Sequence, residues 1–176
     1  METARLLIRR FSSDDWRDMF EYLSQESVVK HEPYDVFTED GCKQEAVRRA
    51  RDDSFLAVCL KDSGKLIGNI YFAKQDFDTW ELGYVFNENY QGMGYATEAV
   101  YAIVDDAFLS GCVRRIIARC NPLNEPSWKL LERLGMCREG HLNRNIFFKK
   151  DGNGKPIWQD TYEYGILAAE WFCRTL

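Results

Sequence analysis

The segment that decides the fold is NYQGMGYATEA, residues Asn89–Ala99, which joins a strand-like run to a helix-like run. The first four N–H groups of an α-helix have no partner within the helix, and that end carries a partial positive charge. Gly92, Gly94 and Ala96 are small enough to let a phosphate approach those N–H groups closely. The segment therefore predicts an anion-binding turn at the start of a helix.

Four interpretations of this turn compete. A nucleoside triphosphate loop carries Lys-Ser or Lys-Thr after its glycines, and no such pair follows here. The dinucleotide fingerprint G-x-G-x-x-G is matched at Gly92 and Gly94, but its third position is Thr97, and several strand-like runs precede the turn. A plain connecting turn and a site for the pantetheine-diphosphate of coenzyme A are the remaining interpretations.

Around the turn, hydrophobic periodicity and cap residues predict one mixed α/β domain over residues 1–176. Ser13 and Thr38 are the expected N-caps of the first two helices, because acidic residues follow each of them. Strands are expected at 5–11, 55–61, 66–74, 80–86, 113–120, 137–149 and 157–167, and helices at 13–24, 39–51, 95–110 and 125–134.

The turn, read as Q-x-x-G-x-A from Gln91 to Ala96, resembles the Q/R-x-x-G-x-G/A signature of the GNAT superfamily of N-acetyltransferases. The preceding strand ELGYVF, the pair Asn124-x-x-Ser127 and the later Leu-Gly-Met are similar to the branch that contains the ribosomal-protein N-terminal acetyltransferases RimJ and RimL. The resemblance covers nearly the whole chain. It implies a central mixed, mostly antiparallel, twisted sheet of about seven strands, splayed at the middle and flanked by about four helices.

The resemblance also implies where acetyl-CoA binds. The turn residues that it assigns to the coenzyme are Gln91, Gly92, Met93, Gly94, Tyr95, Ala96 and Thr97. Near Val85 and Phe86 the strand is expected to separate from its neighbour, pair with the pantetheine arm and offer an N–H to the oxyanion of the reacting thioester. Asn124 is expected to contact the coenzyme from the opposite side.

The implied acceptor is a primary amine that attacks the thioester of acetyl-CoA directly, within a ternary complex. Amines with the pKa of a lysine or an α-amino group are mostly protonated at pH 7, so their proton needs a route away. Glu81 is the candidate base, although an exposed strand carboxylate is an equally good interpretation. Ser127 is the candidate proton or hydrogen-bond donor to the leaving thiolate, or else a structural residue at a helix start.

Composition and residue spacing bear on possible partners, metals and cellular location. A net charge of −5 argues against a nucleic-acid partner, and no apolar run approaches the roughly 18–20 residues of a membrane span. The histidines and cysteines show no metal-ligand spacing, so no metal is expected. The cysteines are interpreted as reduced, structural thiols, and Cys120 is the best candidate for the alternative, a catalytic thiol. The N-terminus does not resemble a secretion signal, so a cytoplasmic location is expected.

The identity of the acceptor stays open: a protein N-terminus, an antibiotic, a polyamine or an amino acid. Acidic residues at Glu32, Asp35, Glu81 and Asp160 would suit a cation, and the resemblance places residues 33–34 and 158–160 beside the acceptor. The chain is expected to be a monomer or a homodimer. The alternative function is a catalytically weak, GNAT-like module that binds acetyl-CoA as a sensor.

Overall fold

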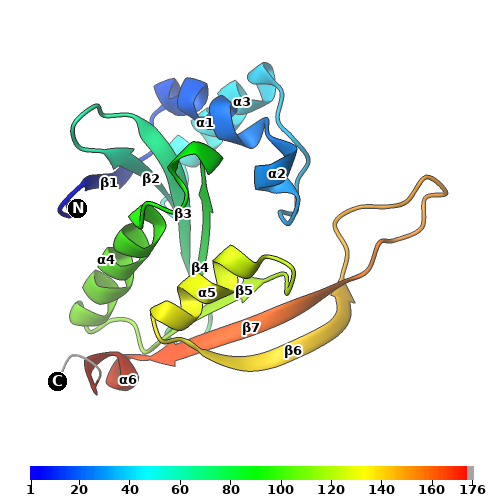
Figure 1. Ribbon diagram of the computed structural model, residues 1–176. Helices are drawn as coiled ribbons and strands as arrows, with labels where there is room; N and C mark the ends of the chain where they lie inside the picture. The colour runs from blue at the N-terminus through cyan, green and yellow to red at the C-terminus, as the bar shows by residue number, and fades with distance from the viewer. Residues whose placement is uncertain (174–176) are drawn as a thin grey trace.

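The computed structural model describes residues 1–173 (Figure 1). Its strands are β1 (Leu6–Arg10), β2 (Phe55–Leu60), β3 (Leu66–Lys74), β4 (Thr79–Phe86), β5 (Arg115–Cys120), β6 (Cys137–Ile146) and β7 (Gln159–Leu167). Its α-helices are α1 (Trp16–Leu23), α2 (Glu26–Val29), α3 (Glu39–Ala50), α4 (Tyr95–Leu109), α5 (Glu125–Arg133) and α6 (Ala168–Cys173). Two short 3₁₀ helices, η1 (Ser13–Asp15) and η2 (Glu88–Tyr90), precede α1 and α4.

The strands form one sheet in the order β1-β2-β3-β4-β5-β7-β6. Only β4 and β5 pair in parallel, and every other neighbouring pair is antiparallel. The expected mixed, mostly antiparallel sheet is therefore confirmed. The parallel pair is joined through α4, which crosses over one face of the sheet (Figure 1).

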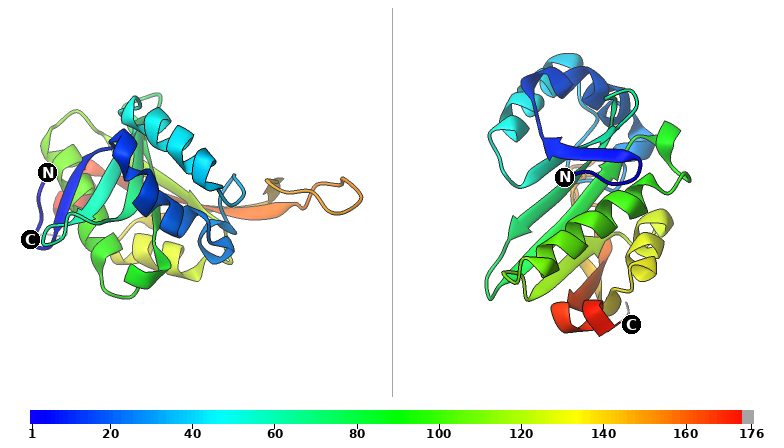
Figure 2. Two further views of the ribbon diagram at one scale, coloured as in Figure 1. Left: turned by 90° about the horizontal axis from the view of Figure 1, so that it is seen from above. Right: turned by 90° about the vertical axis from the view of Figure 1, so that its left-hand side faces the viewer.

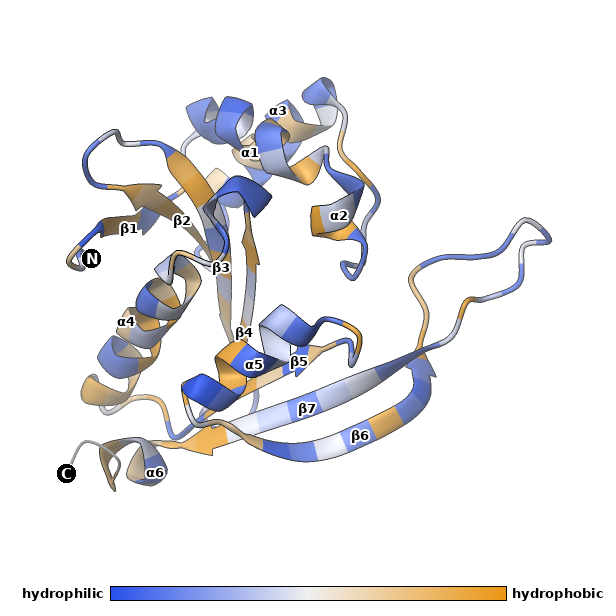
Figure 3. Ribbon diagram, in the orientation of Figure 1, coloured by the Kyte–Doolittle hydropathy of each residue, from blue (hydrophilic) through white to orange (hydrophobic). Residues whose placement is uncertain are grey.

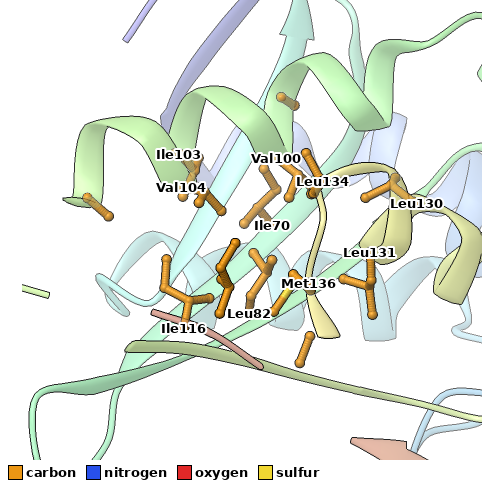
Figure 4. Packing of buried hydrophobic residues seen from close by; sticks show 14 of the residues in the cluster. Ile70, Leu82, Val100, Ile103, Val104, Ile116, Leu130, Leu131, Leu134 and Met136 are labelled. Atoms are coloured by element: carbon orange, nitrogen blue, oxygen red, sulfur yellow. The ribbon is translucent and has the colours of Figure 1, made fainter. Parts of the chain in front are cut away.

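The alternation of side chains along β4 divides the interior into two cores, one on each face of the sheet. Leu82 faces α4 and α5, and packs with residues such as Ile70, Val100, Ile116 and Leu131 (Figure 4). Val85 faces the other way and packs in the core that α1 and α3 cover. The helices therefore lie on both faces of the sheet (Figure 2).

The expected N-cap of the first helix at Ser13 is wrong by one residue. The Ser12 side chain accepts a hydrogen bond from Asp14 N–H at 3.3 Å, and the Asp15 carboxylate accepts from Ser12 N–H at 2.7 Å. These two hydrogen bonds form a reciprocal capping box in which Asp15 occupies the third helical position. Asp15 therefore caps the helix start together with Ser12, in addition to placing an acidic group in the first turn. Thr38 is confirmed as a cap, since its hydroxyl oxygen accepts from Gly41 N–H at 3.1 Å.

The last two strands are shorter than expected, since β6 ends at Ile146 and β7 begins at Gln159, and their pairing shifts register between Leu142 and Ile146. Arg144 lies in this irregularity with a φ of 46°, and its N–H donates to the Asp160 carboxylate. The connection from β6 to β7 projects from the body (Figures 1 and 2). β6 is the exposed edge of the sheet and is mostly hydrophilic (Figure 3), so it adds little to either core.

Two helices were not expected from the sequence. The four-residue helix α2 lies in the segment taken as irregular, and α6 continues directly from β7. Trp171 of α6 is buried against Tyr101 and Phe108 of α4, and its indole N–H donates to Asp105 at 2.9 Å. Within residues 1–173, no helix is both long and apolar enough to cross a membrane.

Candidate active site

The sheet opens between its two central strands. Parallel pairing of β4 with β5 begins at Thr79 and Arg115 and ends at Leu82 and Ala118. The rest of β4, residues 83–86, has no partner in β5, although it stays paired with β3 on its other edge. The predicted splay is therefore present. Val85 and Phe86 lie within it, so part of their backbone faces the opening.

A cleft of about 1270 Å³ follows this opening. The predicted site residues that line it are Glu81, Val85, Phe86, Gln91, Gly92, Gly94, Tyr95, Ala96, Thr97, Asn124 and Ser127. Met93 is the one predicted residue that does not line it, and its side chain is 54% exposed. The fold therefore brings the turn, the splayed strand and the start of α5 to one cavity.

The turn before α4 needs its glycines for their backbone conformation. Gly92 and Gly94 have φ angles of 74° and 81°, in the left-handed region that side chains with a Cβ rarely adopt. Gly94 is the N-cap of α4, so no side chain caps the first N–H groups of this helix. Gln91 braces the turn against the splayed strand, because its Nε2 donates to the Phe86 carbonyl at 3.2 Å.

Arg5, at the start of the chain, fastens the same turn. Its Nη1 donates to the Met93 carbonyl at 3.0 Å, and its Nε donates to the Glu98 carboxylate at 2.7 Å. Its guanidinium also lies 4.4 Å from the centre of the Tyr95 ring. A positive charge therefore lies beside the turn that is predicted to bind an anion. Sequence reasoning missed Arg5, because this contact joins residues far apart in the chain.

Ser127 is held by a tyrosine of the splayed strand. The Tyr84 hydroxyl donates to the Ser127 carbonyl at 2.9 Å, and its oxygen lies 3.1 Å from Ser127 Oγ. Because the phenolic hydrogen is used on the carbonyl, the Ser127 hydroxyl can donate to the phenolic oxygen. Burial raises the pKa of Tyr84, so the phenol stays neutral across the physiological range. Sequence reasoning did not single out Tyr84.

The Cys120 thiol lies beside Ser127. Burial raises the pKa of Cys120 to about 11, although a hydrogen bond with Ser127 acts in the opposite direction. A thiol with that pKa is protonated at neutral pH, and the thiolate is the nucleophilic form of cysteine. This environment argues against Cys120 as a nucleophile.

Glu81 lies on β4, one residue before the last paired position. Its carboxylate accepts hydrogen bonds from Arg119 at 3.2 Å and from Gln75 at 3.3 Å. Glu81 lines the cleft but already has a basic partner. Its role as the base stays a prediction.

Asn124 begins α5 on the opposite side of the cleft. Its carbonyl accepts from Ser127 N–H at 3.1 Å, while its side-chain amide makes no capping hydrogen bond. The amide is therefore free to serve a ligand in the cleft. Across residues 1–173, no group of three or more His, Cys, Asp or Glu side chains is arranged to hold a metal ion.

Comparison with known proteins agrees with this geometry. The profile of the acetyltransferase (GNAT) domain matches residues 5–137. An uncharacterized N-acetyltransferase of Bacillus subtilis (strain 168), YnaD, is 43% identical over 171 residues, which cover 96% of this chain and 97% of the relative. The ribosomal-protein-serine acetyltransferase of Escherichia coli (strain K12) is 33% identical over 85 residues, covering 47% of this chain and 48% of the relative.

A crystal structure of a GNAT-family acetyltransferase from Bacillus anthracis matches with a TM-score of 0.87 and 37% identity. The match covers 97% of this chain and 99% of that one. The sequence match to this ribosomal-protein enzyme covers about half of the chain, whereas the match to the Bacillus anthracis structure covers nearly all of it. The splayed sheet, the glycine turn and these matches together show that the chain is an acyltransferase of the GNAT family of N-acetyltransferases.

Proposed function

We propose that this protein transfers the acetyl group of acetyl-CoA to a primary amine by direct attack within a ternary complex. The observation that carries the proposal is the shared cleft, in which the uncapped N-terminus of α4 and the unpaired end of β4 both take part. A helix N-terminus suits a pyrophosphate, and an unpaired strand edge suits the amide-bearing pantetheine arm. GNAT-family enzymes use acetyl-CoA, and the residues present fit it.

The coenzyme would be held from two sides. On one side, backbone N–H groups of residues 92–97 would bind the pyrophosphate, and Arg5 would add positive charge behind them. On the other side, the free side-chain amide of Asn124 would contact the coenzyme across the cleft. Backbone groups at Val85 and Phe86 would align the pantetheine arm along the splay.

The thioester carbonyl would then lie near the splayed end of β4. A backbone N–H there would stabilise the oxyanion as the amine attacks, because such donors act most strongly on charge that develops in the transition state. Ser127 would supply a hydrogen bond or a proton to the departing thiolate, with its Oγ positioned by Tyr84. The predicted base, Glu81, lies on the same strand, and other carboxylates that line the cleft are alternative candidates for the base.

We propose a peptide or protein N-terminus as the acceptor, with a small-molecule amine as the alternative. An α-amino group has a pKa of roughly 7.7–8.0, so it loses its proton near neutral pH more readily than an alkylamine does. The partial likeness to the ribosomal-protein-serine acetyltransferase supports this choice. The acidic side chains of the cleft suit either kind of cation.

A binding experiment tests the coenzyme. Thermal unfolding is followed with acetyl-CoA, CoA, NAD and ATP added separately. A ligand at 100 times its Kd adds about 2.7 kcal/mol of stability, which raises Tm by roughly 5–10 °C for a domain of this size. A rise with acetyl-CoA and CoA alone is the expected result, and no rise with either contradicts the proposal. Tight binding without turnover of any amine would favour the sensor alternative.

A further inference from the structure

Four acidic side chains line the cleft: Glu32, Glu45, Glu81 and Asp160. A carboxylate that receives an ammonium ion and takes its proton must have lone pairs that no basic side chain already occupies. The ion-pair and hydrogen-bond partners of each of the four carboxylates therefore show which of them could act as the base.

Two of the four are neutralised by arginines. The Glu45 carboxylate accepts from Arg48 at 2.6 Å and from Arg49 at 2.7 Å. The Glu81 carboxylate accepts from Arg119 at 3.2 Å. To protonate either carboxylate would weaken an ion pair, and the adjacent guanidinium repels an incoming ammonium ion.

Asp160 is also engaged. One of its oxygens lies 2.9 Å from His141 Nε2, and the other accepts from Arg144 N–H at 2.8 Å. These hydrogen bonds lower the pKa of the Asp160 carboxyl, the one from Arg144 most. A carboxylate with a lowered pKa is a poor proton acceptor.

Glu32 differs from the other three. Its carboxylate forms no salt bridge with any Lys, Arg or His in the part of the chain that the structure describes. Its backbone N–H donates to the Val29 carbonyl at 2.9 Å, which places Glu32 just after α2, at the wall of the cleft. The Tyr34 hydroxyl is its hydrogen-bonding neighbour.

The charged and titratable groups around Glu32 come from three elements. Burial raises the pKa of Glu32 to about 7. The Arg49 guanidinium of α3 and the Tyr34 hydroxyl act in the opposite direction and lower this pKa. Tyr22 of α1 lies behind Tyr34, and burial lowers the pKa of the neighbouring His31, which keeps that ring neutral. A carboxyl with a pKa near the working pH accepts a proton and releases it readily.

We propose that Glu32 receives the ammonium group of the acceptor and takes its proton before the amine attacks acetyl-CoA. The proposal rests on the proposed function. It is carried by the position of Glu32 in the cleft wall and by the absence of a basic partner among the described residues.

The proton balance is complete with this assignment. The ammonium group gives one proton to the Glu32 carboxylate, and the neutral nitrogen forms a bond to the acetyl carbonyl carbon. The C–S bond then breaks, the nitrogen loses its second proton, and the leaving thiolate gains one through the hydrogen-bonding groups at Ser127. Glu32 returns its proton to solvent, so the products are the acetamide, free CoA and one proton.

The test compares Glu32→Gln with wild type on two amines, spermidine and an arylamine that is neutral at pH 7. Gln keeps the size and hydrogen bonding of Glu32 but cannot take a proton. With spermidine we expect kcat/KM to fall by about 100-fold or more, the usual effect of losing a general base. With the arylamine we expect a much smaller loss, because no proton needs to be removed first. CoA binding, measured by calorimetry, stays unchanged.

Two further variants sharpen the comparison. Glu163→Gln changes a half-buried carboxylate that also pairs with Arg119 but does not line the cleft, so its rates match wild type. Glu81→Gln tests the competing base. Between pH 7 and 9 the wild-type kcat/KM for spermidine stays level, and below pH 7 it falls as Glu32 gains a proton. Glu32→Gln shows no bend near pH 7, because its rate follows the free-amine fraction throughout.

The outcomes separate the two proposals. Equal rates for wild type and Glu32→Gln, an equal loss with both amines, or a loss confined to Glu81→Gln overturns the role of Glu32 alone. A wild-type protein that binds CoA yet acetylates neither amine nor a peptide with a free N-terminus overturns the transferase proposal together with the role of Glu32. A protein that fails to bind CoA contradicts the coenzyme assignment itself.

Discussion

The Tyr84 hydroxyl lies 3.1 Å from Ser127 Oγ and donates to the Ser127 carbonyl at 2.9 Å. This contact joins the splayed end of β4 to the first turn of α5, across the cleft in which the thioester would react. The position of the Ser127 hydroxyl therefore depends on the splayed strand itself. Tyr84 acts in this account as a positioning residue.

Removal of the Ser127 hydroxyl tests its role as a donor. We expect Ser127→Ala to lower kcat by about 10- to 100-fold with KM for acetyl-CoA unchanged, because the bond to the departing thiolate forms only as the C–S bond breaks. Tyr84→Phe should lower kcat less, and the double variant should match Ser127→Ala, since both changes act through one hydroxyl. Independent, additive losses, or no loss in Ser127→Ala, would contradict the account.

Removal of Arg5 tests the support of the coenzyme turn. Arg5→Ala takes away the bond to the Met93 carbonyl and a positive charge beside the expected pyrophosphate. We expect Kd for CoA, measured by calorimetry, to rise roughly tenfold, which corresponds to about 1.4 kcal/mol. Arg10→Ala, at the other end of β1, removes an exposed ion pair with Asp53 and should leave Kd unchanged. Equal effects of the two variants would show that Arg5 has no special link to the site.

Gly94 can be tested against a matched glycine. Gly94 and Gly64 both have left-handed φ angles, 81° and 70°, so an alanine at either position is expected to destabilise the fold by about 1 kcal/mol. A Cβ added at Gly94 would lie at the turn, 3.4 Å from Arg5 Nη2, whereas a Cβ added at Gly64 would meet nothing within 4 Å. We therefore expect Gly94→Ala alone to weaken CoA binding. A similar loss in Gly64→Ala would point to general destabilisation.

The buried charge of Glu32 predicts a pH-dependent stability. Its pKa is raised to about 7 in the folded protein from 4.5, so the folded state holds the proton more tightly than the unfolded state does. That contribution is complete below about pH 4.5 and is lost as the pH rises through 7. We expect Glu32→Gln to be more stable than wild type by roughly 1–2 kcal/mol at pH 8 and by much less at pH 5, in urea unfolding. An equal difference at both pH values would contradict the raised pKa.

The local features of the fold could be predicted because neighbouring residues produce them. The alternation in ELGYVF and the glycines of the turn predict a strand followed by the start of a helix, and the structure contains both. The helix α2 was missed because its four residues are too few to show a helical period. The prediction of Ser13 as the cap fails because the hydrogen bond from Ser12 N–H to the Asp15 carboxylate is visible only in three dimensions.

The candidate site could be predicted only in part. Its turn comes from one stretch of sequence, whereas Arg5, Tyr84 and Glu32 join it through contacts across the fold. No local pattern predicts that Glu81 pairs with Arg119, or that Glu32 forms no salt bridge within residues 1–173. These partners decide which carboxylate is free to receive an ammonium ion, so a choice between candidate bases needs the structure.

Acetyl transfer is the central claim, and a turnover assay tests it most directly. The purified protein is incubated with acetyl-CoA and either a peptide with a free N-terminus or a small amine, while thiol release and the mass of the acceptor are followed together. The account predicts free CoA and acetylated acceptor in equal amounts, with both lost in Gly94→Ala at limiting acetyl-CoA. Binding of acetyl-CoA with neither product, on every amine tried, would contradict the transferase and leave a coenzyme-binding module.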